Sequence, residues 1–250
     1  MGYNELFVKS FRYGMMFGKD IKPGDSVSVS VTNTNDIILA IKKAYIDMSP
    51  RTFKNSNSDK NNKNLNSKNK ESLFLELANK FAEYMNNGAD NFEVWHYDIC
   101  DFFIKRFSAI LKEAGKNPND ATYGKAQKII NMTFKYLYCF DDAYRYAERF
   151  EPCHMALDSY ILNWVNEWFI EQYNKGKARG EKLSRSGKNQ LPKWSQLAYK
   201  AECGNIPQYI EIQNAIKARV SKEFGKPPIE AEFEIWYSER KKAEKKEKKV

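Results

Sequence analysis

Residues 123–140 read YGKAQKIINMTFKYLYCF, and residues 153–162, after a charged interval, read CHMALDSYIL. The first stretch carries apolar side chains on most sides of a helix expected over 126–140, which is typical of a helix in the middle of a domain. The second places Asp158 and Ser159 ahead of a new apolar run, where either side chain can cap the next helix. Two helices so close together and so apolar predict a mainly α fold.

Helical periodicity continues on both sides of this stretch. Ser72 is expected to cap a helix that ends at Asn86-Asn87-Gly88, and another helix is expected from Phe92 to Ala114. The alternating sequence VSVSVT at 27–32 predicts one short strand, followed by a helix that Asn35-Asp36 would cap. Further helices are expected at 194–201, at 207–224 and from 229 onward.

Composition divides the chain into four parts. Residues 51–71 are nearly all Asn, Lys and Ser, so we expect a flexible linker or insertion with too little apolar surface to order itself. Residues 72–237 are expected to form one helical domain. Residues 1–50 would pack on this domain, and 238–250 would form a charged tail.

The chain has 250 residues, a formal net charge of +9 and a pI near 9.1. Such a charge favours polyanionic partners, nucleic acid first and an acidic membrane surface second. The basic loop 175–188 and the lysines of 241–249 are candidate phosphate contacts. No apolar run approaches the ~20 residues that span a bilayer, and no secretory leader is evident. Four cysteines without a CxxC pair are typical of free thiols, so we expect a cytoplasmic protein.

The residues Gly124-Lys125-Ala126-Gln127-Lys128 place a glycine four positions before a lysine at the start of the central helix. A tight turn that enters a helix exposes backbone N–H groups, which can hold a phosphate. The positive end of the helix dipole and partial burial both disfavour the ammonium form of Lys128. A neutral amine can attack carbon, and Asp158, at the head of its own helix, could orient that amine.

The segment from Tyr123 to Lys128 resembles the hairpin of the helix-hairpin-helix DNA glycosylases, in which an apolar residue precedes Gly-x-Gly-x-Lys. Ala126 stands where that pattern has its second glycine. Leu157-Asp158-Ser159 is similar to the Val-Asp-Thr motif that carries the catalytic aspartate of these enzymes. The interval between Lys128 and Asp158 is closest to that of the archaeal 8-oxoguanine DNA glycosylases. The resemblance covers residues 118–165.

This resemblance implies a multi-helix glycosylase with β-lyase activity on a damaged or modified base, with 8-oxoguanine as one candidate. Lys128 would attack C1′ of a nucleotide flipped out of duplex DNA, and Asp158 would support the reaction. Tyr123, Gly124, Lys125, Ala126 and Gln127 would contact DNA. The implied enzyme needs no cofactor and no metal, and we expect it to act as a monomer away from membranes. The candidates for the base pocket are Trp95, His96, Phe134, His154, Trp164 and Trp236.

Two alternatives remain open at the level of sequence. A non-catalytic helical protein of a mobile element or defence system could use the same Gly124 turn to bind nucleic acid. Arg149 and His154 also match the Arg-x4-His pattern of HEPN ribonucleases, although Pro152 between them would interrupt a helix. Lys128 could also be an ordinary lysine of a core helix, and Asp158 no more than an N-cap.

Overall fold

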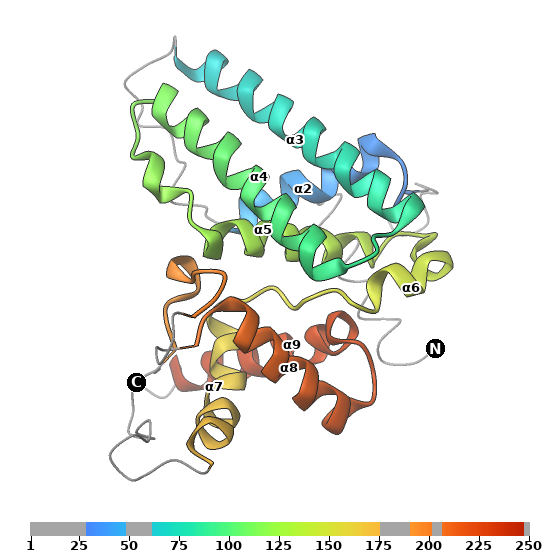
Figure 1. The fold of residues 1–250 in the computed structure, drawn as a ribbon, viewed down its shortest axis with the longest axis vertical. Coiled ribbons are helices and arrows are strands. Elements are labelled where there is room, and N and C mark those ends of the chain that lie inside the picture. The colour runs from blue at the N-terminus through green and yellow to red at the C-terminus, as the bar shows by residue number, and fades with distance from the viewer. Residues whose placement is uncertain (1–28, 49–61, 176–190, 202–206, 248–250) are drawn as a thin grey trace.

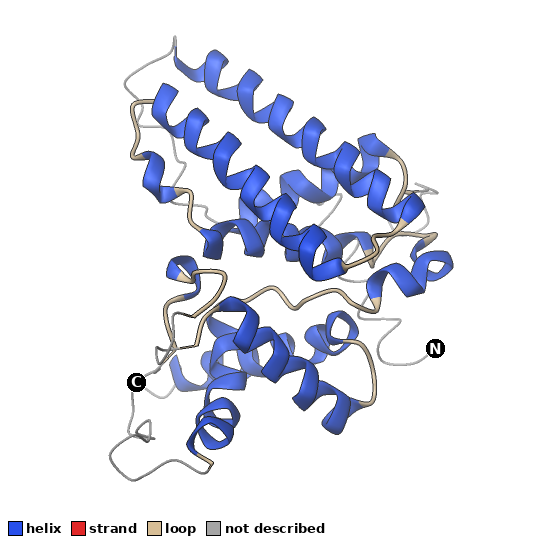
Figure 2. Cartoon of the chain, in the orientation of Figure 1, coloured by secondary structure: helices blue, strands red, loops and turns tan. Residues whose placement is uncertain are grey.

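The computed structural model describes residues 29–48, 62–175, 191–201 and 207–247. Within these ranges the regular structure consists of helices, without strands, which confirms the mainly α prediction (Figure 2). The predictions for the basic loop at 175–188 and for the first 28 residues lie almost entirely outside the described ranges.

The helices form two layers (Figure 1). The helices of the first layer are α2 (Thr34–Met48), α3 (Asn62–Asn87), α4 (Phe92–Glu113) and α5 (Tyr123–Leu137). The helices of the second are α7 (Ser159–Asn174), α8 (Tyr209–Phe224) and α9 (Pro228–Glu247). The short helix α6 (Ala147–Phe150) and an extended stretch at 151–158 connect them, and this stretch runs between the layers in Figure 1.

Helix α5 is the centre of the first layer, and it packs against both α2 and α4. Every residue from Ala126 to Leu137 is buried, as expected of a helix that is apolar on most sides. Thr122 caps the helix, because its hydroxyl accepts a hydrogen bond from the N–H of Lys125 at 3.3 Å. The helix therefore begins and ends three residues earlier than the predicted range of 126–140.

The hydrophobic core has two centres, one in each layer. The first is built mainly from side chains of α2 to α5, and Ile229 of α9 joins it. The second is built mainly from side chains of α7 to α9, together with Met155, Leu157, Leu191 and Leu197. Tyr123 and Trp194 are partly buried, and both pack against both clusters. These two aromatic side chains therefore lie where the layers meet.

The expected strand at 27–32 is wrong for the described residues 29–32, which form a turn. The N–H groups of Val29 and Val31 donate to the carboxylates of Asp141 and Asp142, at 3.0 and 2.9 Å. Side-chain acceptors thus take the place of a neighbouring strand. The following helix begins at Thr34, and the cap is Asn33 instead of the predicted Asn35-Asp36, since its side chain accepts from the N–H groups of both.

The expectation of a flexible segment through residue 71 is wrong from Asn62 onward, where α3 has already begun; residues 51–61 lie outside the described ranges. Ser72 lies inside this helix and bonds to Glu76, so it is not a cap. Asn69 donates to Glu113 of α4, which is a polar partner that composition cannot reveal. The predicted end holds, because Gly88 follows the helix with a positive φ of 75°.

The expected helix at 194–201 is also wrong, because only Trp194–Gln196 forms a single 3-10 turn. The carbonyl of Ser195 accepts a hydrogen bond from Thr122, the cap of α5, and that of Leu197 accepts one from the N–H of Gly124. The carbonyls of Ala198 and Tyr199 accept from the first N–H groups of α8. These hydrogen bonds take the place of those that would close further helical turns. The other predicted helices, 92–114, 207–224 and the one from 229, are confirmed as α4, α8 and α9 within two residues at their starts.

Candidate functional site

Lys128 lies in the second turn of α5, and only 9% of its surface is exposed. Its Nζ atom stands 4.4 Å from the centre of the Trp194 ring, within the range of a cation–π contact. Among the described residues, its amine has no hydrogen bond and no ion pair. The amine is thus nearly enclosed by the protein without being tied to a carboxylate.

Burial lowers the pKa of the Lys128 amine, since desolvation penalises the charged form. Four charged groups from four helices modify this effect. The carboxylates of Asp158 (α7), Asp47 (α2) and Glu232 (α9) raise the pKa, and the ammonium of Lys135 on α5 lowers it. Asp158 is the strongest of these charges, and the net direction remains downward. Asp158 therefore has the largest electrostatic effect of these four groups on the pKa of Lys128.

Asp158 is the N-cap of α7, which confirms the prediction that Asp158 or Ser159 caps this helix. Its Oδ1 atom accepts hydrogen bonds from the N–H groups of Tyr160 and Ile161, at 2.9 and 3.0 Å. Its Oδ2 atom accepts one from Nε1 of Trp236 at 3.1 Å. The carboxylate is thus held from two sides, and Trp236, a candidate for the base pocket, lies directly beside it.

Lys135 and Glu232 form an ion pair at 2.8 Å, and their side chains are only 2% and 1% exposed. The other carboxylate oxygen of Glu232 accepts from the N–H of Ala156 at 3.1 Å. The rings of Phe233 and Trp236 lie 5.1 and 5.4 Å from Nζ of Lys135. Sequence reasoning missed this pair, although Lys135 follows Lys128 by seven positions and so lies on the same face of α5.

The glycine turn does not present free N–H groups. The N–H of Gly124 donates to the carbonyl of Leu197 at 3.0 Å, and that of Lys125 to its own cap, Thr122. A Cβ on Gly124 would overlap the carbonyl oxygen of Trp194 and stand 2.9 Å from the carbonyl carbon of Ser195. The glycine is therefore needed for the close approach of another backbone, and the expected phosphate grip is not available in this arrangement.

Most of the remaining members of the predicted DNA-contacting group are also directed inward. Ala126 and Gln127 are fully buried, and the Gln127 side chain donates to the carbonyl oxygens of Gly124 and Leu157, at 2.9 and 3.1 Å. Tyr123 is half-buried, with its hydroxyl 3.4 Å from Nδ1 of His96. Lys125 is partly exposed and remains the one member that can reach a phosphate without rearrangement.

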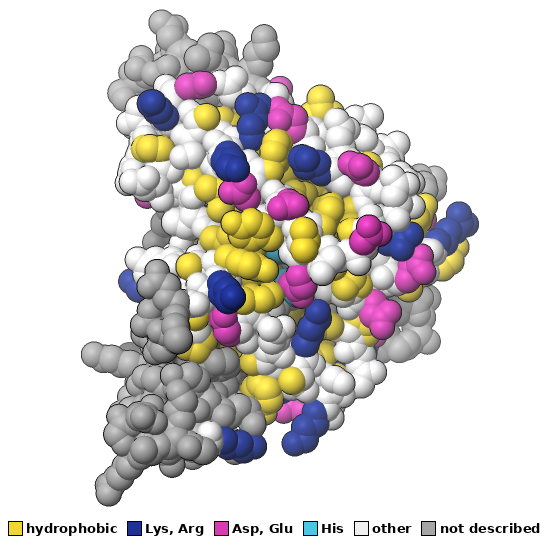
Figure 3. Space-filling view, viewed as in Figure 1, with side chains coloured by type: hydrophobic (Ala, Val, Ile, Leu, Met, Phe, Trp, Pro, Cys, Tyr) yellow, Lys and Arg dark blue, Asp and Glu magenta, His cyan; other side chains and the backbone are white. Residues whose placement is uncertain are grey.

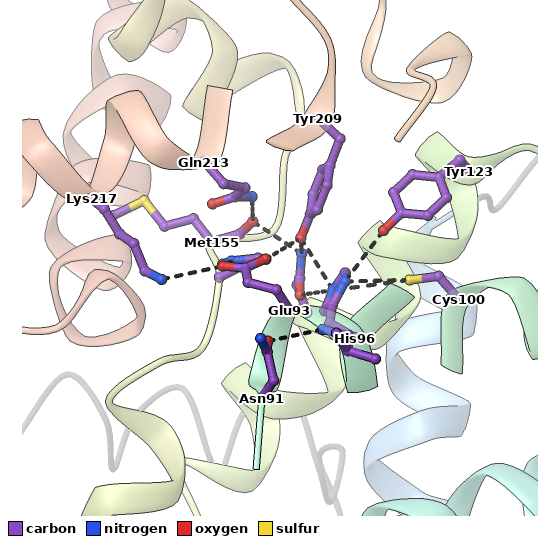
Figure 4. Close-up of polar contacts among 12 residues, drawn as sticks. Asn91, Glu93, His96, Cys100, Tyr123, Met155, Tyr209, Gln213 and Lys217 are labelled. Carbon is purple, nitrogen blue, oxygen red and sulfur yellow. Dashed lines mark hydrogen bonds and ion pairs between the residues drawn. The ribbon is translucent and has the colours of Figure 1, made fainter. Parts of the chain in front are cut away.

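His96 and His154 belong to a separate buried network between α4 and α8 (Figure 4). The Tyr209 hydroxyl lies at its centre, 2.7 Å from Nδ1 of His154 and 3.1 Å from Nε2 of His96. Asn131 contacts both the hydroxyl and His96, at 2.9 Å each, and Glu93 lies 2.9 Å from Nε2 of His154.

Burial lowers the pKa of both histidines, to about 3 in the case of His96. Both imidazoles are therefore neutral at physiological pH. Their ring nitrogens lie within hydrogen-bonding distance of the network, so they act as interior hydrogen-bonding groups.

The other aromatic candidates for the base pocket are packed against neighbouring side chains. Phe134 is fully buried among Phe81, Tyr84 and Trp95, and Trp95 makes edge-on or tilted ring contacts within the same group. Trp164 lies in the second layer with the guanidinium of Arg219 3.9 Å above its ring. Of the predicted pocket residues, only Trp236 lies at the Lys128–Asp158 site. Trp194, which the predictions omitted, lies there as well.

The Arg-x4-His pattern does not form the single helix that HEPN ribonucleases use. Arg149 belongs to α6, which ends at Phe150, and His154 lies in the extended stretch that follows. The two side chains also have different partners, because Arg149 pairs with Glu148 at 3.2 Å while His154 joins the buried network.

The surface in Figure 3 carries basic and acidic side chains interspersed around exposed apolar groups. In the described ranges, no three His, Cys, Asp or Glu side chains are grouped so that they could hold a metal ion. None of the described helices is both long and apolar enough to cross a membrane.

No family model, curated protein or solved structure matches this chain.

Proposed function

We propose that the protein is a DNA glycosylase with lyase activity, with Lys128 as its nucleophile and Asp158 as the supporting carboxylate. One observation carries the proposal: Lys128 is a buried lysine whose amine forms no ion pair with a described residue, and Asp158 is the charged group with the largest effect on its pKa. Lys135 provides the contrast on the same helix, because its ammonium is held by Glu232 at 2.8 Å.

The lowered pKa of Lys128 serves this chemistry directly. An ordinary lysine, with a pKa of ~10.4, is almost entirely protonated at neutral pH and has no lone pair to donate. Burial shifts Lys128 toward the neutral amine, which is the form that attacks carbon. Since the amine forms no hydrogen bond with a described residue, its lone pair is not engaged by a donor.

The proposed reaction balances at each step. The glycosidic bond from C1′ breaks, and the base leaves with the bonding electron pair and takes up a proton. The lone pair of Lys128 forms a bond to C1′, and the nitrogen then loses one proton to solvent. The C1′–O4′ bond breaks with its electron pair going to O4′, which takes up a proton, and this leaves a protonated imine between Lys128 and C1′. Loss of a C2′ proton then expels the 3′ phosphate. The carboxylate of Asp158 stabilises the positive charge that develops on the sugar.

The surroundings of Lys128 suit a flipped nucleobase. Trp194 and Trp236 supply aromatic faces on which any base can stack. The Lys135–Glu232 pair lies beside Trp236 and offers a buried donor and a buried acceptor. A base inserted there would have to displace part of this packing, because Lys128 is only 9% exposed in the present arrangement.

Borohydride trapping tests the proposal. The protein is mixed with duplex oligonucleotides that carry 8-oxoguanine, other damaged bases or an abasic site, and borohydride reduces any imine to a stable adduct. We expect an adduct with the wild-type protein and with Lys105→Gln, a matched change at an exposed lysine of α4, and none with Lys128→Gln. Binding without any adduct would overturn the proposal and would favour a non-catalytic helical nucleic-acid-binding protein.

A further inference from the structure

Residues 191–201 form a strap that crosses the boundary between the two layers. On one side, the hydroxyl of Thr122 donates to the carbonyl of Ser195 at 2.6 Å, and the N–H of Gly124 donates to that of Leu197. On the other side, the carbonyls of Ala198 and Tyr199 accept from the N–H groups of Tyr209 and Ile210, at 3.1 and 3.0 Å. The strap is therefore fixed by its backbone to the starts of both α5 and α8.

This attachment determines where the side chain of Trp194 lies. The carbonyl of Trp194 rests against Gly124, where any Cβ would overlap it, and its ring covers the Nζ atom of Lys128 at 4.4 Å. A lysine side chain is long and has several rotatable bonds, so a free amine is ordinarily poorly fixed. The ring lies against an amine that forms no hydrogen bond or ion pair with the described residues.

From this geometry we infer that Trp194 is a positioning residue, which holds the amine of Lys128 against its ring and leaves the nitrogen lone pair open to a substrate carbon. The inference rests on the proposed role of Lys128. An aromatic face attracts an ammonium without accepting a conventional hydrogen bond. After deprotonation, a remaining N–H can still point at the ring, which directs the lone pair away from it. A carboxylate in the same place would instead stabilise the charged, unreactive form.

The inference predicts the sign of a pKa change. The charged groups that act on Lys128 are Asp47, Lys135, Asp158 and Glu232, and none of them lies on the strap. If the ring is replaced by an aliphatic group that still covers the amine, the ammonium loses a favourable contact and the pKa of Lys128 falls. If Trp194 only seals the core, its loss admits water and the pKa rises toward its ordinary value.

The experiment compares Trp194→Leu and Trp194→Phe with the wild-type protein. Competitive labelling with acetic anhydride over a range of pH, read by mass spectrometry, gives the titration midpoint of Lys128 without DNA. The rate of borohydride trapping on an abasic duplex is measured in parallel. Phe102→Leu serves as the matched control, because the Phe102 ring lies 4.9 Å from the amine of Lys80 in another part of the chain.

We expect the midpoint to fall by about half a unit to one and a half units in Trp194→Leu, and by less in Trp194→Phe. The rate of trapping per neutral amine should decrease at least tenfold in Trp194→Leu, and Phe102→Leu should change neither quantity. An unchanged or raised midpoint in Trp194→Leu would overturn the inference. Absence of trapping in the wild-type protein would instead refute the proposed function, while the labelling would still report on Trp194.

Discussion

Lys135 and Glu232 join the two layers of the protein through an ion pair that is almost completely excluded from solvent. Lys135 lies on α5, at the centre of the first layer, and Glu232 lies on α9 in the second. Burial raises the pKa of the Glu232 carboxyl, while the neighbouring ammonium opposes that shift. The pair therefore holds a desolvated carboxylate close to the Lys128–Asp158 site.

Removal of one partner of this pair should be costly. We expect Glu232→Gln to lower the free energy of unfolding by about 3–5 kcal/mol, because the ammonium of Lys135 stays buried after losing its carboxylate. Urea unfolding measures the change. Glu244→Gln, which breaks the exposed Arg240–Glu244 pair, should cost no more than about 0.5 kcal/mol. Equal small losses in both variants would contradict this assignment.

Gly124→Ala tests the docking of the strap on α5. A new methyl group would overlap the backbone of Trp194, and a backbone cannot be relieved by a change of rotamer. We expect a loss of about 1–3 kcal/mol, as in other overpacked interiors, together with weaker protection of the Gly124 amide from hydrogen exchange. Lys125→Ala, on the same turn, should stay within about 0.5 kcal/mol of the wild-type protein. A Gly124→Ala protein that is as stable as the wild type, and in which the amide at position 124 keeps its protection from exchange, would refute this account.

Asp158→Asn separates the structural role of this residue from its chemical role. Asparagine caps helices about as well as aspartate, so the free energy of unfolding should change by less than about 1 kcal/mol. The variant removes the charge that most raises the pKa of Lys128, so the labelling midpoint of that amine should move downward. Trapping on damaged DNA should nevertheless be lost. Full trapping by Asp158→Asn would show that Asp158 is a cap without a catalytic role.

The neutral histidines predict sensitivity to acid. Burial lowers the pKa of His96 to about 3 and also lowers that of His154, whereas both would titrate near 6.5 in the unfolded chain. Above pH ~6.5 neither state binds these protons, so they add no pH dependence. Below it the unfolded state binds these protons more readily than the folded state. For His96 the loss of stability should approach about 1.4 kcal/mol per pH unit, and His154 should add a loss in the same direction.

Unfolding by urea at several values between pH 6.5 and 5 measures this slope. His96→Gln should be less stable at neutral pH but should show a shallower slope than the wild-type protein, since one of the two titrating groups is gone. A slope that does not change in His96→Gln would mean that the acid sensitivity arises elsewhere in the protein.

The sequence by itself determined the helices whose signals are local. The helix from Phe92 stops before Gly115, which has a positive φ of 66°, and Asp158 caps α7 through N–H groups two and three residues ahead. The apolar surface of residues 126–137 likewise required a central position. Caps, glycine stops and hydrophobic periodicity act over one or two turns, so they can be recognised without knowledge of the rest of the chain.

Only the tertiary structure decided which groups meet. Glu232 lies 97 positions from Lys135, and Trp194 lies 66 positions from Lys128, so no spacing in the sequence predicts either contact. The role of Gly124 changed for the same reason, because a strap from residues 191–201 occupies the helix start that sequence reasoning left open. Contacts of this kind depend on how the layers pack, and packing energy is shared among many distant side chains rather than encoded in any one segment.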